Sequence, residues 1–112
     1  MEEGIPRKPY KVSEAFNESR KHIYEYSLDK FGYFQAERYH QKIRMSLDTL
    51  HDSYLIYPEC RYLLTKNHMY RNIILDAHLI IYRITIQRIE VLDIIHTASS
   101  IGKIRSIRKI RL

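Results

Sequence analysis

The clearest pattern of apolar and polar positions lies between residues 70 and 96, where three β-rich runs are separated by two or three polar residues. From residue 79 to 86 every even position is apolar, whereas the odd positions change from aliphatic residues to Arg83 and Thr85. Successive side chains of a β-strand point to opposite faces of the sheet. The pattern therefore predicts a strand with one face buried throughout, and a second face that passes from the core to water and carries Arg83.

The next run, residues 89–95, is rich in β-branched residues and has Glu90, Asp93 and His96 at or near its exposed positions. β-Branched side chains fit the pleated surface of a sheet, so a further strand is predicted here. The two polar residues at 87–88 then form a short hairpin connection. Because this turn contains no glycine, the prediction depends on alternation and β-branching rather than on turn chemistry.

Two helical patterns precede these strands. Ser13 can cap a helix that begins at Glu14 and stops at Gly32. The apolar side of this helix carries Phe16, Ile23, Tyr26 and Phe31. In the second pattern the apolar residues recur at spacings of three and four, which predicts a stripe facing the core. These residues are Ala36, Tyr39, Ile43, Leu47 and Leu50. Since only the region of Gly32 separates the helices, they should fold back as an antiparallel hairpin.

The remaining segments complete a prediction of fold class α+β, with the element order β-α-α-β-β-β. Residues 10–12 can form a short first strand, and residues 62–65 a short strand after the helices. The helix hairpin would pack on a small antiparallel sheet. We expect an irregular N-terminal segment at 1–8, one domain at 9–100 and a basic C-terminal tail at 101–112.

Length and composition restrict the class of protein. A chain of 112 residues fits a single domain with one modest core. No run approaches the roughly 18 apolar residues that a membrane helix needs, so we expect neither membrane spanning nor secretion. Cys60 is the only cysteine, which excludes an intramolecular disulfide and favours a cytoplasmic setting. A lone cysteine of this kind is more often a small buried residue than a nucleophile.

The positive charge of the chain is concentrated in the tail. The net charge is +6, of which residues 101–112 carry +5 without a single acid, which leaves +1 for residues 1–100. Isoleucine recurs there every third residue, and this period drifts by about 60° per repeat around an α-helix. Three interpretations stay open for the tail: a terminal helix packed partly on its own sheet, an arm that becomes ordered on a partner, or a polybasic segment attracted to nucleic acid or anionic lipid.

Several of these residues together carry a resemblance to a known family. They are Ala15, Ile23, Tyr26 and Gly32, then Ala36, Tyr39, Ile43, Leu47 and Leu50, then Pro58, Arg71, the LIIYRI run at 79–84 and Ile-Ile-His at 94–96. In this order and spacing the chain resembles the RelE/ParE superfamily of bacterial toxins over about residues 9–100, and more closely its ParE branch. The resemblance implies a small cytoplasmic toxin of a type II toxin–antitoxin, or plasmid stabilisation, system. A cognate antitoxin would neutralise it, in a toxin–antitoxin hetero-oligomer or alongside a dimer.

Two mechanisms are known in that superfamily. ParE-like members inhibit DNA gyrase, whereas RelE-like members cut messenger RNA on the ribosome. RNA cleavage needs groups that activate a ribose hydroxyl, stabilise a charged phosphate and protonate the leaving oxygen. Arg71 matches the first basic position of the RelE branch, but the second falls near Leu79, and residues 97–101 offer neither the arginine nor the tyrosine of that branch. We therefore expect a gyrase inhibitor that acts by binding rather than by catalysis.

Two alternatives stay open: an endoribonuclease with a degenerate site at Arg71, Arg83 and His96, or an inactive binding module of the same fold. Arg83 should face away from the core, either to solvent or to a partner. His96 would act as an acid or base, or simply hydrogen-bond a neighbour at the sheet edge. The residues expected to contact a partner are Arg71, Arg83, His96, Lys103, Arg105, Arg108 and Arg111.

Other candidate chemistry receives less support. Six histidines are scattered without the close spacing of a zinc motif, so we expect no metal site, and no motif for a cofactor occurs. Ten tyrosines offer amphipathic contact groups. Tyr26, Tyr39 and Tyr82 lie on predicted core stripes. Four others near the second strand are either partner anchors or part of a tyrosine-rich core rim: Tyr54, Tyr57, Tyr62 and Tyr70.

Overall fold

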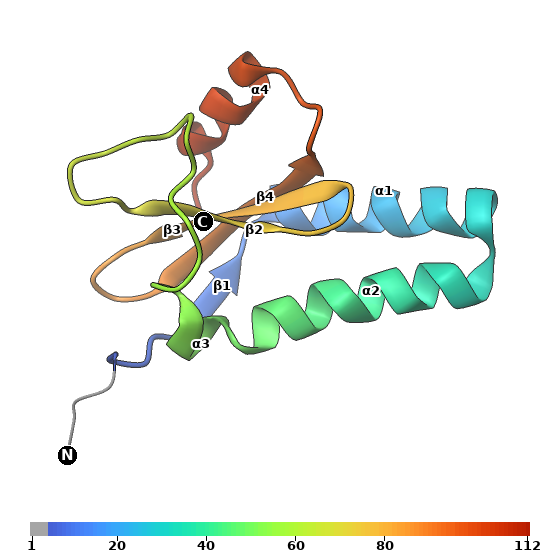
Figure 1. Cartoon of the computed structure of the whole chain (residues 1–112), viewed down its shortest axis with the longest axis horizontal. Helices are drawn as coiled ribbons and strands as arrows, with labels where there is room; N and C mark the ends of the chain where they lie inside the picture. The colour runs from blue at the N-terminus through green and yellow to red at the C-terminus, as the bar shows by residue number, and fades with distance from the viewer. Residues whose placement is uncertain (1–4) are drawn as a thin grey trace.

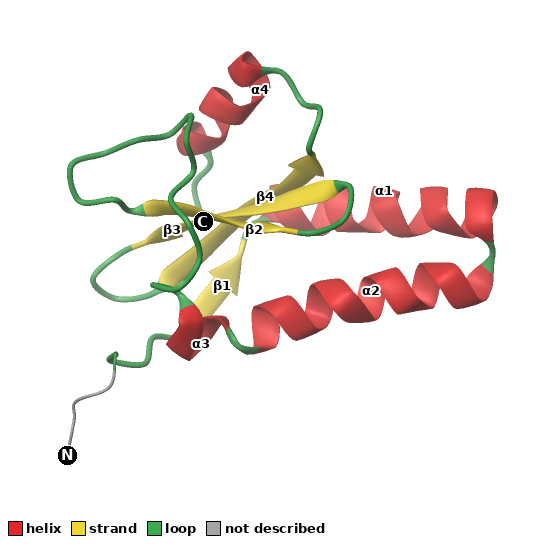
Figure 2. Cartoon of the chain, viewed as in Figure 1, coloured by secondary structure: helices red, strands yellow, loops and turns green. Residues whose placement is uncertain are grey.

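A helix hairpin covers one face of a four-stranded sheet in the computed structural model, which describes residues 5–112 (Figures 1 and 2). The elements are β1 (Tyr10–Val12), α1 (Glu14–Phe31), α2 (Tyr33–Asp48), α3 (Leu50–Ser53), β2 (Tyr70–Ile74), β3 (His78–Ile84), β4 (Ile89–His96), α4 (Ile101–Ser106) and the 3₁₀ helix η1 (Ile107–Lys109). This arrangement confirms the predicted α+β class. The predicted irregular segment lies partly outside the described residues, which begin at residue 5.

The hairpin forms because both ends of α1 are specified locally. The side chain of Ser13 accepts a hydrogen bond from the backbone N–H of Phe16, which caps the first turn as predicted. At the other end the N–H of Gly32 bonds to the carbonyl of Leu28. Gly32 has a φ of 90°, which a residue without a Cβ adopts at little cost, and α2 begins at the next residue.

The sheet is mixed, in the strand order β1-β4-β3-β2. The pairs β2–β3 and β3–β4 are antiparallel, as the short connections between them require. In contrast to the all-antiparallel prediction, β1 pairs in parallel with β4, with Tyr10 opposite Ile89. A parallel pair needs a long crossover, and here the helices and two strands lie between the partners.

Apolar side chains fill both faces of the sheet. A first cluster lies between the sheet and the hairpin and includes Phe16, Ile43, Leu47, Leu50, Ile80, Tyr82 and Val91. A second cluster lies on the other face, under the C-terminal tail and the loop before β2, and includes Cys60, Leu63, Tyr70, Ile81, Leu92, Ile95, Ile104 and Ile107. The prediction that the second face of β3 emerges into water is therefore wrong, because segments distant in sequence cover it.

Residues 62–65 do not form the predicted strand. In this loop, the backbone N–H of Thr65 donates to the Glu59 carboxylate at 3.2 Å, and the Thr65 hydroxyl accepts from the N–H of Met69 at 3.1 Å. Side chains thus satisfy backbone groups that a sheet ladder would otherwise bind. The backbone of the loop pairs with the sheet at an isolated bridge between Glu59 and Arg71.

The connection between β3 and β4 is longer than predicted. It spans residues 85–88, because the Thr85 hydroxyl bonds to both the N–H and the carbonyl of Arg88. The strand consequently ends at Ile84, and Ile86 is 93% exposed instead of lying in the core. The alternation of apolar and polar residues does not show where a strand ends, because the loop residues continue the same alternation by chance.

The end of the helix hairpin extends beyond the sheet (Figure 1). Tyr26 and Phe31, predicted to face the core, are each 59% exposed for this reason. Together with Leu28, Tyr33 and Phe34 they form a surface that we call the hairpin overhang. No helix in the described part of the chain is long and apolar enough to cross a membrane.

Candidate functional site

The structure does not bring together the three residues proposed as a catalytic group. Arg71 lies on the edge strand β2, beside the loop that precedes it. His96 is the last residue of β4 and pairs with His78, whereas Arg83 lies towards the other end of β3. Each of the three residues therefore has separate surroundings.

Arg71 holds the loop before β2 against the sheet. Its Nε donates to the carbonyl of His68 at 3.0 Å, and its Nη1 donates to the carbonyls of Leu55 and Tyr57 at 3.2 and 2.9 Å. These bonds use the Nε and Nη1 donors of the guanidinium. Arg71 therefore joins three separate points of one loop to the strand.

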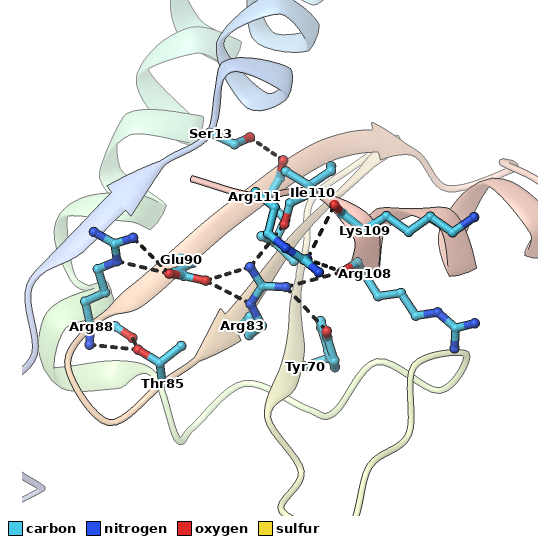
Figure 3. Close-up of polar contacts among 11 residues, drawn as sticks. Ser13, Tyr70, Arg83, Thr85, Arg88, Glu90, Arg108, Lys109, Ile110 and Arg111 are labelled. Carbon is cyan, nitrogen blue, oxygen red and sulfur yellow. Dashed lines mark hydrogen bonds and ion pairs between the residues drawn. The ribbon is translucent and has the colours of Figure 1, made fainter.

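Arg83 is buried, with 8% of its surface exposed, although it was predicted to face solvent or a partner. Its Nε and Nη2 donate to one carboxylate oxygen of Glu90, directly opposite on β4, at 2.8 and 2.6 Å. The other oxygen of Glu90 accepts from Arg88 at 3.0 Å. Arg83 also donates to the backbone carbonyls of Arg108 and Ile110 in the tail, at 3.4 and 3.1 Å (Figure 3). The sequence prediction is wrong because the tail covers this position.

The two charges of this pair hold each other in the ionised form. Burial alone lowers the pKa of Arg83, but hydrogen bonds with Tyr70 and Glu90 outweigh it and raise the pKa above its ordinary value. Burial likewise raises the pKa of Glu90, and the bonds from Arg83 and Arg88 outweigh it, so that pKa is lowered. The result is an ion pair in which each charge favours the ionised form of the other, and which is bound within the protein.

The tail packs on the sheet as a helix, the first of the three interpretations. Ile104 and Ile107 are buried in the second cluster, whereas Ile101 remains 45% exposed. Side chains three residues apart diverge in an α-helix but are eclipsed in a 3₁₀ helix. The change from α4 to η1 at Ile107 therefore keeps Ile107 and Ile110 on the same side. All five cationic side chains of the tail are exposed: Lys103, Arg105, Arg108, Lys109 and Arg111.

His96 belongs to a different cluster, together with His78 and Tyr39. The rings of His78 and His96 lie 5.6 Å apart in an edge-to-face arrangement. The hydroxyl of Tyr39 is 2.7 Å from Nδ1 of His78, and Nδ1 of His96 accepts from the N–H of Ala98 at 3.0 Å. Burial lowers the pKa of His78, and the nearby His96 lowers it further. These imidazoles can exchange protons with a ligand, but no cation that could stabilise a phosphate lies among them.

A pocket of about 600 Å³ lies beside these histidines, beneath the hairpin overhang. Its lining residues are His22, Ile23, Tyr26, Ser27, Phe31, Gln35, Tyr39, Asp76, Ala77, His78 and His96. The one carboxylate in this lining, Asp76, binds Lys42 at 3.0 Å. Among residues 5–112, no three histidine, cysteine, aspartate or glutamate side chains are placed to hold a metal ion. The pocket can thus accept an apolar group with a hydrogen-bonding edge.

Sequence reasoning missed Tyr39 and His78 as members of this cluster. Tyr39 was assigned to the core stripe of α2, and His78 to a turn. The signal for His78 was present, because an antiparallel pairing of β3 and β4 places His78 opposite His96. No local signal could have located Tyr39 there, since the contact joins residues 39 positions apart.

The tyrosines around the loop before β2 mainly form a core rim. Tyr54 and Tyr70 are buried, and Tyr57 and Tyr62 are partly buried. The hydroxyl of the central Tyr82 donates to the carbonyl of Tyr54 at 2.7 Å, which satisfies its polar end inside the core. Cys60 is also buried, as predicted, and burial raises its pKa.

Comparisons with known proteins agree with this fold. The family model described as "ParE toxin of type II toxin-antitoxin system, parDE" matches residues 10–101. Among solved structures, the "Chromosomal ParDE TA system from P. aeruginosa" is similar, with a TM-score of 0.67 and 15% sequence identity over 82% of this chain and 98% of that chain. None of the curated proteins matches the sequence. Since the family model covers most of its length, the chain belongs to the ParE toxin family of type II toxin–antitoxin systems.

Proposed function

We propose that this toxin acts in the cytoplasm by binding and inhibiting DNA gyrase, and that a cognate antitoxin binds and neutralises it. The observation that supports this proposal most is that Arg83 of β3 is already bound within the protein. It lies under the tail, and its donors bind Glu90 and two backbone carbonyls. Because the arginine of this strand is bound within the fold, the toxin is expected to act through contacts with another protein rather than through this cation.

The alternative, a RelE-like endoribonuclease, would need Arg71, Arg83 and His96 to lie around one phosphate. Stabilising a pentavalent phosphate requires donors that are free and aimed at the developing charge. Arg71 already binds three loop carbonyls through its Nε and Nη1, and Arg83 would have to displace the tail. His96 is available as an acid or base, but the structure places it opposite His78, away from both arginines. This distribution favours binding over RNA cleavage.

The hairpin overhang is consistent with a protein partner. Its aromatic side chains have exposed fractions from 59% for Tyr26 to 82% for Phe34. Tyrosine and phenylalanine give large contact areas at a small cost in side-chain entropy and are frequent in the energetic centres of protein interfaces. Two of them, Tyr26 and Phe31, line a pocket that could receive an apolar side chain of the partner.

Two assays separate the two functions. The full-length protein, expressed from an inducible promoter without an antitoxin, should inhibit growth and induce the DNA-damage response. The purified protein should block supercoiling by gyrase. Primer extension on abundant messages should show no new cleavage sites in the first minutes after induction. Coexpression of the antitoxin from the neighbouring reading frame should restore growth.

The exposed His96 provides a specific control. Replacing it with Gln removes an acid or base without disturbing the core, because the side chain is exposed. Loss of a catalytic acid or base lowers a rate by about 10²–10⁴-fold, whereas loss of one peripheral contact should lower inhibition by less than about tenfold. Early message cleavage that disappears in His96→Gln would establish the nuclease. Growth that remains normal without any antitoxin would instead indicate an inactive binding module.

A further inference from the structure

The tail of this protein presents five cations on a fixed part of the fold. Lys103, Arg105, Arg108, Lys109 and Arg111 are all exposed, and we call them the basic tail surface. Among the ion pairs formed within residues 5–112, none includes a member of this surface. The carboxylate beneath it, Glu90, is shared by Arg83 and Arg88. The charge of +5 in residues 101–112 therefore has no ion-pair partner among the described residues.

The tail is held in place from below. Ile104 and Ile107 are buried in the second cluster, and the guanidinium of Arg83 binds the carbonyls of Arg108 and Ile110. In Figure 3 the side chains of Arg108 and Lys109 extend away from this network, and that of Arg111 folds back towards it. Because the backbone is already ordered, a ligand would not have to compensate the entropy of fixing a disordered arm.

The chemistry of this surface restricts its partner. The buried isoleucines of the tail face the sheet, so they cannot enter a lipid bilayer while the tail is docked. A protein interface normally has an apolar core, and the outward face of the tail offers only the partly exposed Ile101. Interfaces with nucleic acids are instead polar and strongly positive, with arginine and lysine bound to phosphates. Three of the five cations are arginines, which match the oxygen pairs of a phosphate.

The tail also lacks the groups that bind single strands. Proteins that bind single-stranded nucleic acid usually stack bases on aromatic side chains, and residues 101–112 contain no aromatic residue. We propose that the basic tail surface binds the phosphate backbone of double-stranded DNA without reading its sequence. The choice of DNA over duplex RNA rests on the proposed function, since gyrase acts on DNA, and such contacts would hold the toxin on the DNA that gyrase carries.

The direct test measures binding of the purified full-length protein to a fluorescent DNA duplex of mixed sequence by anisotropy, without gyrase. Each phosphate neutralised adds about −0.9 to the slope of log K against log salt concentration. Five cations give a maximum slope of about −4.5, and we expect between about −3 and −4.5 from 50 to 200 mM salt. A slope weaker than about −1 would overturn the proposal.

Two triple variants remove the same amount of charge from different places. Lys103→Gln, Arg105→Gln and Lys109→Gln together should weaken the slope by about 2.7 and the affinity by at least about tenfold at 100 mM salt. The matched control replaces the exposed Lys21, Arg38 and Arg44 of the helix hairpin with Gln. It should change the affinity by less than about threefold. Thermal unfolding of both variants verifies that they are folded. Equal losses in the two variants would overturn the localised surface in favour of a general effect of net charge.

Competitors identify the partner class. Duplex RNA bound more than about tenfold tighter than duplex DNA would overturn the assignment to DNA. Displacement of the DNA by polyglutamate, or by phosphatidylglycerol vesicles, at an equal concentration of charge would overturn the preference for nucleic acid. A failure of DNA binding can be distinguished from a failure of the proposed function. DNA binding can fail while gyrase is still inhibited, and gyrase inhibition can fail while the protein still binds DNA.

Discussion

Replacing Arg83 with Met removes the guanidinium from its buried site and retains a flexible apolar side chain about as long as the aliphatic part of arginine. In the native protein this group bonds to Glu90 at 2.6 and 2.8 Å and to the tail carbonyls of Arg108 and Ile110. After the substitution Glu90 keeps only Arg88, at 3.0 Å, and both tail carbonyls lose a donor. The change thus tests the ion pair and the anchoring of the tail together.

The expected loss of stability is large. Removing one partner of a buried ion pair costs about 3–5 kcal/mol, because the remaining charge is left without compensation. The side chains of Arg83 and Glu90 are only 10% and 12% exposed, so this range applies to them. The bond from Arg88 compensates part of the charge of Glu90, which places the expected loss near the lower limit, about 3 kcal/mol. That is a substantial part of the roughly 5–15 kcal/mol that stabilises a typical domain.

Urea denaturation of the wild type, Arg83→Met and the double variant Arg83→Met with Glu90→Met measures this loss. The double variant has no buried charge to compensate, so it should regain at least about half of the stability. Hydrogen exchange should show weaker protection of the α4 amides in both variants, since neither holds the tail carbonyls. Arg88→Gln is the control, and it should cost less than about 1 kcal/mol because Arg88 is partly exposed.

Three results would contradict this reasoning. A loss below about 1 kcal/mol in Arg83→Met would place the pair among surface ion pairs, which contribute little. A double variant as unstable as the single one would show that the uncompensated charge of Glu90 is not the cause. Unchanged protection of α4 would mean that the isoleucines alone hold the tail.

Three further changes test other parts of the fold. Ile104→Ala should cost about 2–5 kcal/mol in urea denaturation, whereas the exposed Ile101→Ala should cost less than about 0.5; similar losses would contradict a docked tail. Burial lowers the pKa of His78 and of His40, so the folded state resists their protonation. Their stabilisation is complete above about pH 6.5 and is lost as pH falls through the lowered values, and His78→Gln should flatten this dependence; an unchanged slope would exclude His78 as its source. Burial also raises the pKa of Cys60, so a thiol reagent at pH 8 should react with it only as the protein unfolds; rapid labelling of the native protein would refute its burial.

Elements encoded by neighbouring residues were predictable. The cap at Ser13 and the turn at Gly32 defined the first helix, because both act within one helical turn. The apolar spacing of α2 and the β-branched runs of β3 and β4 identified those elements. Which residues lie next to these elements in space was harder to predict from the sequence. The segment 62–65 has the pattern of a strand, but in the structure the Glu59 carboxylate and the Thr65 hydroxyl accept hydrogen bonds from the backbone N–H groups of Thr65 and Met69.

The candidate site was less predictable than the fold. The sequence marked Arg71, Arg83 and His96 as candidates by the chemistry of their side chains. It could not show that Arg71 binds loop carbonyls, or that His96 lies beside His78 and Tyr39. Each of these contacts depends on how separate elements meet, and a side chain's type does not determine whether its donors are free.

By itself the sequence determined the helix hairpin, the three consecutive strands and the concentration of charge in the tail. These features follow from periodicity, capping and composition, which act over a few residues. Only the tertiary structure decided that Arg83 is buried and that Tyr26 and Phe31 are exposed. The physical reason is that burial depends on which distant segment covers a residue. The tail residue Ile110, 27 positions away, supplies a carbonyl to Arg83, whereas the sheet ends before it reaches the overhang.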